Sequence, residues 1–449
     1  MKVILISANS VTNPYPVYPL CLDYVSHAIS PDHQVIITDV NEAGDYASLG
    51  KIIKDFSPDL IGLSIRNIDN TDSTDPRGFI GQYQKLAETI RAHSEAPLVL
   101  GGSGFSILPG EMMKALKADY GIIGEGERLA LLLDALEKKK DASDIPGLVI
   151  SNSEKSTPPP LPPPFPRRFD ANSSYLKFYL KKGGMLNLQT KRGCHFKCIY
   201  CTYPHIEGHI LRLAPPDHIA ETALQLQNAG AKYLFITDSA FNADYQHSIE
   251  VAQAFQKARI SVPWGAFFIP TNPPENYYKI MADAGLTHVE FGTESLSNQV
   301  LTAYRKPFQT HHVFHSHRAA SDAGLYVAHY FLMGGPGEDS ESVNETLYNI
   351  DKLNKTVLFF FCGIRIYPHT TLYDIAIKEG QITLSQNLLE PVFYQSRFIS
   401  VRKIIQRVEE KAKGRLNWII GSGGEKTVQI ISKMYERGFS GPLWEFLIS

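Results

Sequence analysis

Three of the five cysteines in this 449-residue chain lie within eight residues of one another, at Cys194, Cys198 and Cys201. Thiolates at offsets 0, 4 and 7 can wrap one small metal cluster, and cysteine thiolates are the usual ligands of iron–sulfur clusters. A cubic cluster of four irons normally takes four thiolates, so three leave one iron with an open position, as in catalytic metal sites. The triplet therefore predicts an iron–sulfur site whose open iron binds amino and carboxylate groups and passes on an electron.

Two other readings of the triplet stay open at this point. A zinc site completed by His205 is sterically possible, although zinc sites of this type usually occur in small ribbons or fingers. Three unrelated core cysteines are the other alternative. An odd and sparse set of cysteines argues against a disulfide framework. Cys21 stands alone, and Cys362 is expected to be a small buried hydrophobe.

The cysteines follow the first of six strand–helix units expected between residues 186 and 375. The expected strands are 186–190, 233–237, 262–268, 288–291, 327–332 and 358–366, and the expected helices include 218–228, 246–258, 275–284, 313–323 and 340–353. Six such units predict a partial (β/α)6 barrel, TIM-like and open on one side, with its chemistry at the carboxyl ends of the strands. Residues 376–449 are expected to form a helical C-terminal cap.

Residues 1–150 show a second alternation of short apolar runs and helical patterns. Strands are expected at 2–7, 34–39, 60–65, 97–101 and 120–123, and helices at 19–29, 47–56, 78–93 and 109–116. This order predicts a Rossmann-like, doubly wound parallel sheet, which binds ligands at the carboxyl ends of its strands. Polar or glycine-rich residues follow three of these strands; the candidate ligand-binding residues are Ser64, Arg66, Asn67, Gly102, Ser103, Gly104, Glu125 and Gly126. Tight turns between strand and helix would explain the same glycines without a ligand.

A proline-rich linker is expected at 151–185, with an extended stretch at 158–166, because proline fixes φ and donates no hydrogen bond. We interpret it as a surface strap; a docking motif for a proline-binding module is the alternative. The net charge of −2 argues against a nucleic-acid-binding protein, which usually has a strongly basic domain. No apolar run reaches the roughly 18–20 residues of a membrane helix. The short apolar run after Met1 is expected to be a buried strand of a cytoplasmic protein.

The cysteine triplet, with aromatic Tyr200 before its last member, resembles the radical S-adenosylmethionine (SAM) superfamily. The resemblance extends to the segments 289–295, 331–338 and 364–370. It implies a [4Fe–4S] cluster on the three thiolates and SAM on the fourth iron, cleaved to a 5′-deoxyadenosyl radical. The SAM-binding residues that it implies are Tyr200, Asp238, Glu294, Gly335 and Ile366. The segment 237–242 departs from the usual Gly-Gly-Glu, which leaves the contacts to the methionine amine at this strand open.

The N-terminal domain, residues 1–150, is similar to the cobalamin-binding domain of one large class within this superfamily, including an opening of the type Asn13-Pro14-Tyr15-Pro16. The resemblance implies cobalamin as a third cofactor, bound by the polar and glycine-rich strand ends. The sequence has no Asp-x-His-x-x-Gly motif, whose histidine would ligate cobalt. The 64–70 loop is then expected to face the lower side of cobalamin, with Arg66 or Asn67 nearest.

The resemblance implies methylation of an unactivated carbon by the deoxyadenosyl radical and methylcobalamin. Oxidation, cyclisation or ring contraction without methyl transfer is the alternative within the class, and an iron–sulfur electron carrier or metal-stapled binding protein the alternative outside it. Methylthiotransferases that act on RNA are disfavoured, because their N-terminal domain supplies further cluster cysteines. The expected partners are a small-molecule or lipid-like substrate and an external electron donor of the flavodoxin or ferredoxin type. The aromatic runs 267–268 and 359–361 could line the substrate pocket, although such runs more often belong to the core.

Overall fold

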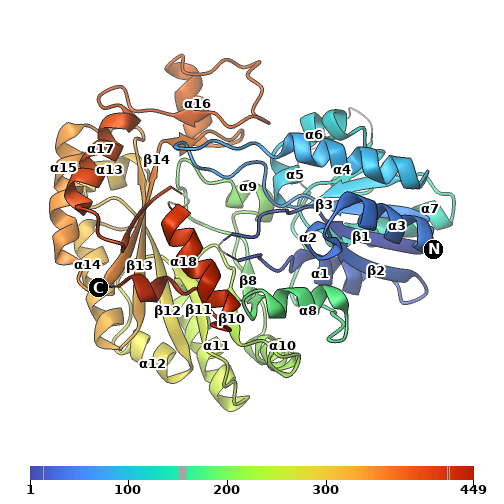
Figure 1. Cartoon of the computed structure of the whole chain (residues 1–449), viewed down its shortest axis with the longest axis horizontal. Helices are drawn as coiled ribbons and strands as arrows, with labels where there is room; N and C mark the ends of the chain where they lie inside the picture. The colour runs from blue at the N-terminus through green and yellow to red at the C-terminus, as the bar shows by residue number, and fades with distance from the viewer. Residues whose placement is uncertain (14, 151–157, 422, 424, 449) are drawn as a thin grey trace.

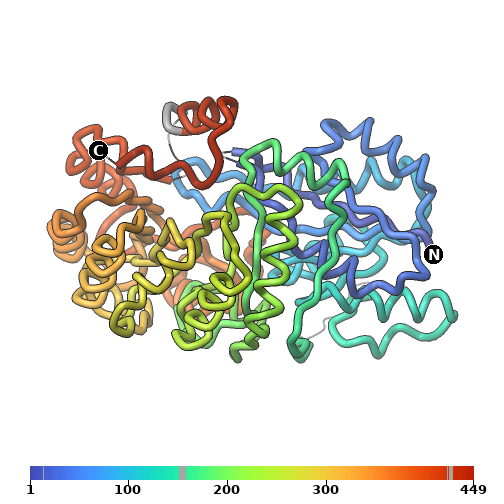
Figure 2. The backbone as a smooth tube through the Cα atoms, turned by 90° about the horizontal axis from the view of Figure 1, so that it is seen from below, coloured from blue at the N-terminus to red at the C-terminus, as the bar shows by residue number. Residues whose placement is uncertain are grey.

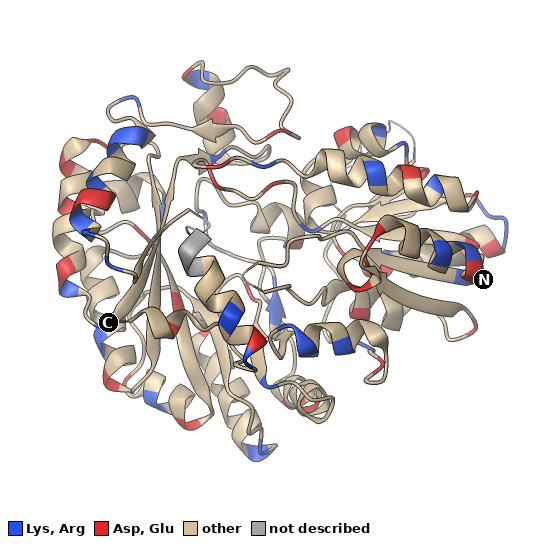
Figure 3. Cartoon of the chain, viewed as in Figure 1, with Lys and Arg blue, Asp and Glu red and all other residues tan. Residues whose placement is uncertain are grey.

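The computed structural model describes residues 1–13, 15–150, 158–421, 423 and 425–448, arranged as two lobes, each built on a parallel sheet (Figure 1). Figure 2 shows the lobes side by side, with the C-terminal segment running along one side of their junction. Pro14 and the polar start of the expected linker, 151–157, lie outside the described residues. Acidic and basic residues are interspersed over the outer helices in Figure 3, as the near-zero net charge leads one to expect. Among the described residues, no helix has both the length and the apolar character that crossing a membrane requires.

The N-terminal sheet has six strands in the spatial order β2-β1-β3-β4-β5-β6. They are β1 (Lys2–Ser7), β2 (Gln34–Asp39), β3 (Leu60–Ser64), β4 (Leu98–Gly101), β5 (Tyr120–Ile122) and β6 (Leu148–Ile150). The first five pair in parallel, and β6, which the sequence did not predict, pairs antiparallel with β5. The expected doubly wound sheet is thus confirmed. Its order reverses at β1, which has β2 on one side and β3 on the other, so the crevice for a ligand opens between β1 and β3.

Strict alternation along these strands explains why helices cover both faces. Ile4 and Ile6 pack against one helical layer, and Val3 and Leu5 against the other. Because successive strand residues point to opposite faces, a continuous apolar run requires a cover on each side. The first layer contains α3 (Tyr46–Phe56), α4 (Ile80–His93) and α6 (Pro109–Leu116), and the second α1 (Cys21–Ala28) and α7 (Leu129–Glu137). The short helices α2 (Val40–Ala43) and α5 (Ser103–Ile107) follow β2 and β4.

The second sheet has seven parallel strands in the order β17-β14-β13-β12-β11-β10-β7. They are β7 (Met185–Leu188), β10 (Tyr233–Ile236), β11 (Trp264–Phe268), β12 (Leu286–Glu294), β13 (Tyr326–Met333), β14 (Thr356–Cys362) and β17 (Trp418–Ile420). The helices connecting them are α10 (Pro216–Asn228), α11 (Tyr245–Lys257), α12 (Tyr277–Asp283), α13 (Asn298–Ala303), α14 (Thr310–Asp322), α15 (Ser340–Asn349), α16 (Thr371–Lys378) and α17 (Val401–Ala412). Among the described residues β7 and β17 remain unpaired with each other, so the expected open barrel is confirmed.

The C-terminal region differs from the expected helical cap. The strand expected at 358–366 breaks at Gly363, whose φ of +85° ends β14, and β15 (Ile364–Arg365) pairs instead with β16 (Phe393–Tyr394). The chain then returns to the barrel as β17, a seventh strand that the sequence did not predict. After α18 (Glu425–Glu436), the short helix η4 (Trp444–Leu447) packs against the inner face of the sheet, where Trp444 meets Ala328 and Val357.

Buried ion pairs join the two lobes. Arg167 binds Asp23 of α1 through two nitrogens, at 2.5 and 3.1 Å, and donates a third bond to the carbonyl of Asn187 in β7 (2.7 Å). Glu125 of the N-terminal lobe pairs with Arg192 (2.8 Å) and Arg212 (2.7 Å) of the barrel lobe. Prolines 158–166 run between the lobes as an extended strap, and α8 (Ser174–Lys181) occupies the end of the expected linker. These contacts fix the carboxyl ends of the two sheets opposite each other.

Removing the carboxylate of the buried pair should therefore cost much more stability than removing an exposed one. Asp23→Ala leaves the Arg167 guanidinium buried without its counter-charge, and we expect a loss of about 3–5 kcal/mol in the free energy of unfolding. Asp75→Ala, which removes the exposed partner of Arg77, should leave the urea midpoint unchanged. Urea titration followed by circular dichroism checks both variants; equal midpoints would contradict the role given to the buried pair.

Candidate active site at the junction of the two sheets

A tight loop after β8 (Lys191–Arg192) carries the three cysteines. Gly193 opens it with φ +89°, and a Cβ at this position would lie 2.1 Å from the carbonyl oxygen of Ile210. The amide of Gly193 donates to Glu207 (3.1 Å), and the amide of Cys194 to the carbonyl of Gly208 (3.0 Å). The three thiols face one another closely enough for charge on one to raise the pKa of another. The local fold thus gathers the predicted ligands in one place.

The surroundings of these thiols favour the protonated form unless a positively charged metal cluster is bound. Burial raises the pKa of Cys201 to about 12 and also raises the pKa of Cys198, against the lowering effect of Lys306. Metal binding must therefore displace protons from the thiols. The histidine of the zinc alternative, His205, stacks its ring on that of His369, with centroids 4.2 Å apart. In the part of the chain that the structure describes, no set of three or more Cys, His, Asp or Glu could hold a single metal ion.

Lys306 is a buried cation beside the cysteines that the sequence analysis missed. Its Nζ lies 3.0 Å from Oε1 of Glu294 and 3.3 Å from the hydroxyl of Tyr200, two of the residues expected to bind SAM. Burial works against its charge, but Glu294 and Cys198 hold the pKa of Lys306 well above its usual range. Glu294 ends β12 with φ +60°, which turns its backbone away from the strand. The sequence gives no sign that Lys306 is buried, because it stands in the run Tyr-Arg-Lys-Pro-Phe, which looks exposed.

The other three residues expected to bind SAM lie behind this group. The carboxylate of Asp238 is buried and accepts bonds from the Thr190 amide (2.8 Å) and the Lys191 ammonium (2.8 Å), so it braces the start of the cysteine loop. Gly335 is packed, because a Cβ there would lie 2.4 Å from the hydroxyl of Tyr304. Ile366 is fully buried in a cluster that also contains Ile199 of the loop. Tyr200 and Glu294 are thus the members of the set that meet beside the thiols.

A cavity of about 630 Å³ opens between the carboxyl ends of the two sheets. Seven of the eight residues expected to bind cobalamin line it, the exception being Gly104. The barrel lobe contributes further lining residues, among them Asn187, Gln189, Arg192, Thr202, Tyr203 and Thr237. The volume falls in the range of cofactor and ligand pockets. The crevice of the N-terminal sheet therefore extends to Arg192 and Thr202, the residues on either side of the cysteine loop.

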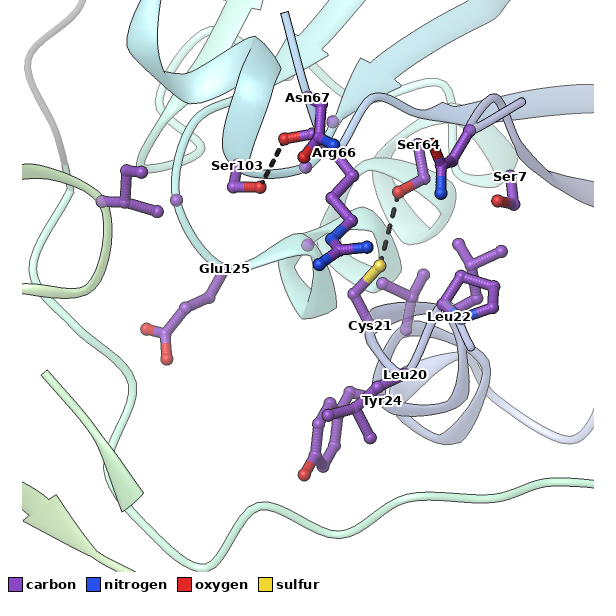
Figure 4. A pocket seen from close by; sticks show the side chains of 18 of the residues that line it. Ser7, Leu20, Cys21, Leu22, Tyr24, Ser64, Arg66, Asn67, Ser103 and Glu125 are labelled. Atoms are coloured by element: carbon purple, nitrogen blue, oxygen red, sulfur yellow. Dashed lines mark hydrogen bonds between the residues drawn. The ribbon is translucent and has the colours of Figure 1, made fainter. Parts of the chain in front are cut away.

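Arg66 and Cys21 project into this cavity from the N-terminal lobe (Figure 4). Among the described residues the Arg66 guanidinium has no hydrogen-bond or ion-pair partner, whereas its carbonyl accepts a bond from Ser103 (2.9 Å). The sulfur of Cys21 lies 3.3 Å from the Ser64 hydroxyl, and burial raises the pKa of its thiol. An exposed cation and a protonated thiol thus lie on the side of the cavity formed by β1, β3 and α1.

Glu125 and the glycines after β4, which were expected to bind cobalamin, also stabilise the fold. Burial alone would raise the pKa of Glu125, but a bond from the Leu161 amide and the ion pairs with Arg192 and Arg212 hold it below its usual range. A Cβ on Gly102 would lie 2.5 Å from the carbonyl oxygen of Ile65, and one on Gly104 3.1 Å from Arg66. These glycines let α5 pack against the loop after β3. Gly101 is different, because a Cβ there meets only the carbonyl oxygen of Ile122, at 4.0 Å.

Substituting any of the three clustered cysteines should remove the metal site and leave the fold. We expect Cys194→Ala, Cys198→Ala and Cys201→Ala to lose most of the iron and sulfide that wild-type protein binds on anaerobic reconstitution, about four of each. Cys21→Ala and Cys362→Ala, which change thiols outside the triplet, serve as matched controls and should keep both. Iron and sulfide analysis checks this. A full cluster in a variant with all three cysteines replaced by alanine would refute the assignment.

The glycines after β4 give a second test, which separates folding from cofactor binding. Gly102→Val forces a side chain against backbone at a positive φ, and we expect it to destabilise the N-terminal lobe. Gly101→Val adds its branch to the cavity, so the fold should survive while cobalamin binding is lost. Thermal unfolding and corrinoid content, measured on both variants, check the pair. Normal cobalamin binding by Gly101→Val would show that the cofactor does not occupy this part of the cavity.

Comparison with known families agrees with this geometry. Residues 188–348 match the radical SAM superfamily, and residues 6–133 match the B12 binding domain. An uncharacterized methyltransferase of Pyrococcus horikoshii is 26% identical over 407 residues, covering 87% of this chain and 86% of the relative. The tryptophan 2-C-methyltransferase of Streptomyces laurentii is 24% identical over 445 residues, covering 82% and 73%.

Solved structures share the whole fold. The radical SAM methyltransferase TsrM of Kitasatospora setae, with cobalamin and a [4Fe–4S] cluster bound, superposes with a TM-score of 0.87 at 19% identity, covering 99% of this chain and 97% of TsrM. The cobalamin-dependent SAM radical enzyme OxsB superposes with a TM-score of 0.64 at 17% identity, covering 97% and 66%. The chain thus combines a B12 binding domain with a radical SAM domain, the two modules of cobalamin-dependent radical SAM enzymes, on either side of one cavity.

Proposed function

We propose that this enzyme methylates an unactivated carbon of a small molecule. One observation carries the proposal: the cavity in the crevice of the B12 binding domain extends to Arg192 and Thr202, the residues on either side of the cysteine loop, so a substrate bound there would lie between the two domains. Relatives that cover most of the chain are named methyltransferases, which supports transfer of a methyl group. We place the domain boundaries near residues 150, 185 and 375.

The residues present fit the three groups that the family implies. Cys194, Cys198 and Cys201 would hold the [4Fe–4S] cluster, and Lys306 and Glu294 offer opposite charges for the carboxylate and the amine or ribose of SAM. The cavity would take cobalamin, with Arg66 among the residues that would contact it. When bound, these groups supply a 5′-deoxyadenosyl radical and a transferable methyl group.

The chain itself positions these groups and excludes water. The Glu125–Arg192 and Asp23–Arg167 pairs fix the distance between the lobes, and the proline strap runs alongside the cavity at Leu161. Arg66 places a permanent positive charge in the cavity, where no side chain among the described residues neutralises it in an ion pair. A guanidinium cannot lose its proton in a protein, so Arg66 would contact the cofactor as a charged hydrogen-bond donor and not as a metal ligand. An electron donor of the flavodoxin or ferredoxin type and a cytoplasmic location complete the proposal.

Isotope transfer tests the proposal without knowledge of the substrate. Holoenzyme prepared anaerobically, with cobalamin and a reductant, is incubated with an extract of small metabolites and with SAM carrying either a CH3 or a CD3 group. We expect a product whose mass differs between the two reactions by the three deuteriums, and 5′-deoxyadenosine formed alongside it. The Cys201→Ala enzyme should form neither. Deoxyadenosine without a labelled product would instead favour oxidation or rearrangement.

A further inference from the structure

Strand β12 is irregular just before Glu294. Its register with β13 shifts there, so that Gly292 stands opposite Tyr330 and Glu294 opposite Phe331. Thr293 is therefore one residue more than the parallel ladder can pair, which makes this a β-bulge. Bulges are rare between parallel strands, and they occur beside active sites, where they change the direction of a side chain.

The bulge determines where the carboxylate of Glu294 lies. Glu294 has a φ of +60°, in the left-handed region that residues other than glycine seldom adopt. A Cβ on Gly292 would lie 3.2 Å from Oε1 of Glu294, so the carboxylate turns back over this glycine. In that position it binds the Lys306 ammonium, at 3.0 Å. A backbone conformation of this kind persists only where surrounding contacts fix it.

Two buried histidines hold the extra residue from the helical side of the sheet. The Thr293 hydroxyl lies 2.6 Å from Nδ1 of His329 in β13, and Nε2 of His329 lies 3.1 Å from Nδ1 of His317 in α14. Thr293 and His329 are fully buried, and His317 is 5% exposed. Burial lowers the pKa of both histidines, that of His317 to about 4, so both rings are neutral at pH 7.

The order of donors along this chain of hydrogen bonds follows from its far end. A backbone bond at Asn354 opposes the lowering of the His317 pKa, as a carbonyl acceptor does. A neutral imidazole has one donor and one acceptor nitrogen. Since His317 donates to this carbonyl, it accepts from His329, and His329 in turn accepts from Thr293. The Thr293 hydroxyl is thus a donor with one fixed acceptor, which holds its residue in the bulge.

This chain of hydrogen bonds joins the segments that carry the two charges beside the cysteines. Thr293 directly precedes Glu294, and α14, which carries His317, begins shortly after Lys306. We propose that His329 is a positioning residue for SAM: by holding Thr293 in the bulge, it keeps the Glu294 carboxylate against Lys306, where SAM would bind. This inference rests on the proposed function, because it assigns a further residue to the same site.

Removing the donor while keeping the shape of the side chain tests the inference. Thr293→Val fills the same space but leaves Nδ1 of His329 without its partner. We expect it to weaken SAM binding by about tenfold, as the loss of a contact behind the ligands does at metal centres. Thr293→Ser, which keeps the hydroxyl, should bind SAM as wild type does. Equilibrium dialysis of labelled SAM against anaerobic holoenzyme without reductant, so that SAM is not cleaved, measures both affinities.

Thr356→Val is the matched control for a loss of stability. Thr356 is 2% exposed and donates to the carbonyl of Val327 (2.8 Å), near the start of β13 and β14 and away from the bulge. Its substitution also removes a buried hydroxyl, so the thermal unfolding midpoint should fall as in Thr293→Val while SAM affinity stays unchanged.

A double variant separates stability from positioning in a second way. His329→Phe keeps a flat ring against Phe291, and together with Thr293→Val it removes both partners of the hydrogen bond. Replacing both partners by apolar groups costs little stability. The double variant should therefore regain most of the unfolding midpoint that Thr293→Val loses and still bind SAM weakly.

Wild-type SAM affinity in Thr293→Val would overturn the inference. An equal loss of affinity in Thr356→Val, or recovery of affinity together with stability in the double variant, would overturn it as well, because SAM binding would then follow stability alone. These affinities are measured without turnover, so they are independent of the proposed function, which depends on label transfer by the wild-type enzyme.

Discussion

The closeness of the two lobes depends on charges buried between them. Parallel sheets present their polar carboxyl ends on one edge, and here two such edges face each other across one cavity. Arg167 reaches from the strap to Asp23 on α1 and to the backbone of β7, and Arg192 and Arg212 reach from the barrel to Glu125. Each arginine has its charge compensated where water is excluded, which makes the arrangement specific in a way that apolar contact alone would not. The cysteine loop begins at Arg192, so the same contacts that join the lobes also place the metal ligands.

This arrangement gives the cavity two unlike sides. The N-terminal side carries the thiol of Cys21 and Arg66, which has no counter-charge among the described residues, whereas the barrel lobe carries, beyond the cavity's lining, the paired charges of Lys306 and Glu294 next to the three clustered thiols. A large neutral or anionic group fits the first side, and a zwitterion fits the second.

The sequence predicted the features that depend on local pattern and missed those that depend on tertiary contacts. Strands β1 and β2 begin and end where their apolar runs do, and the cysteine spacing indicated the cluster loop directly. The seventh strand, β17, was missed because Trp418–Ile420 is too short to stand out before its pairing with β14 is known. Lys306 was missed for a related reason: only the fold brings it to Glu294 from 12 residues further along the chain. Glycines after β4 looked like a cofactor cradle, yet Gly102 is required by the nearby backbone of Ile65.

The position of Trp444 has a consequence for the order in which the protein is made. The barrel's inner face gains this indole, and its bond to Glu290, from a segment that follows every strand of the sheet along the chain. Strand β17, which extends the sheet beyond β14, also comes late in the chain. During synthesis both leave the ribosome after the N-terminal lobe, which can fold earlier. The N-terminal sheet can therefore form before the inner face of the barrel acquires the indole that covers Glu290.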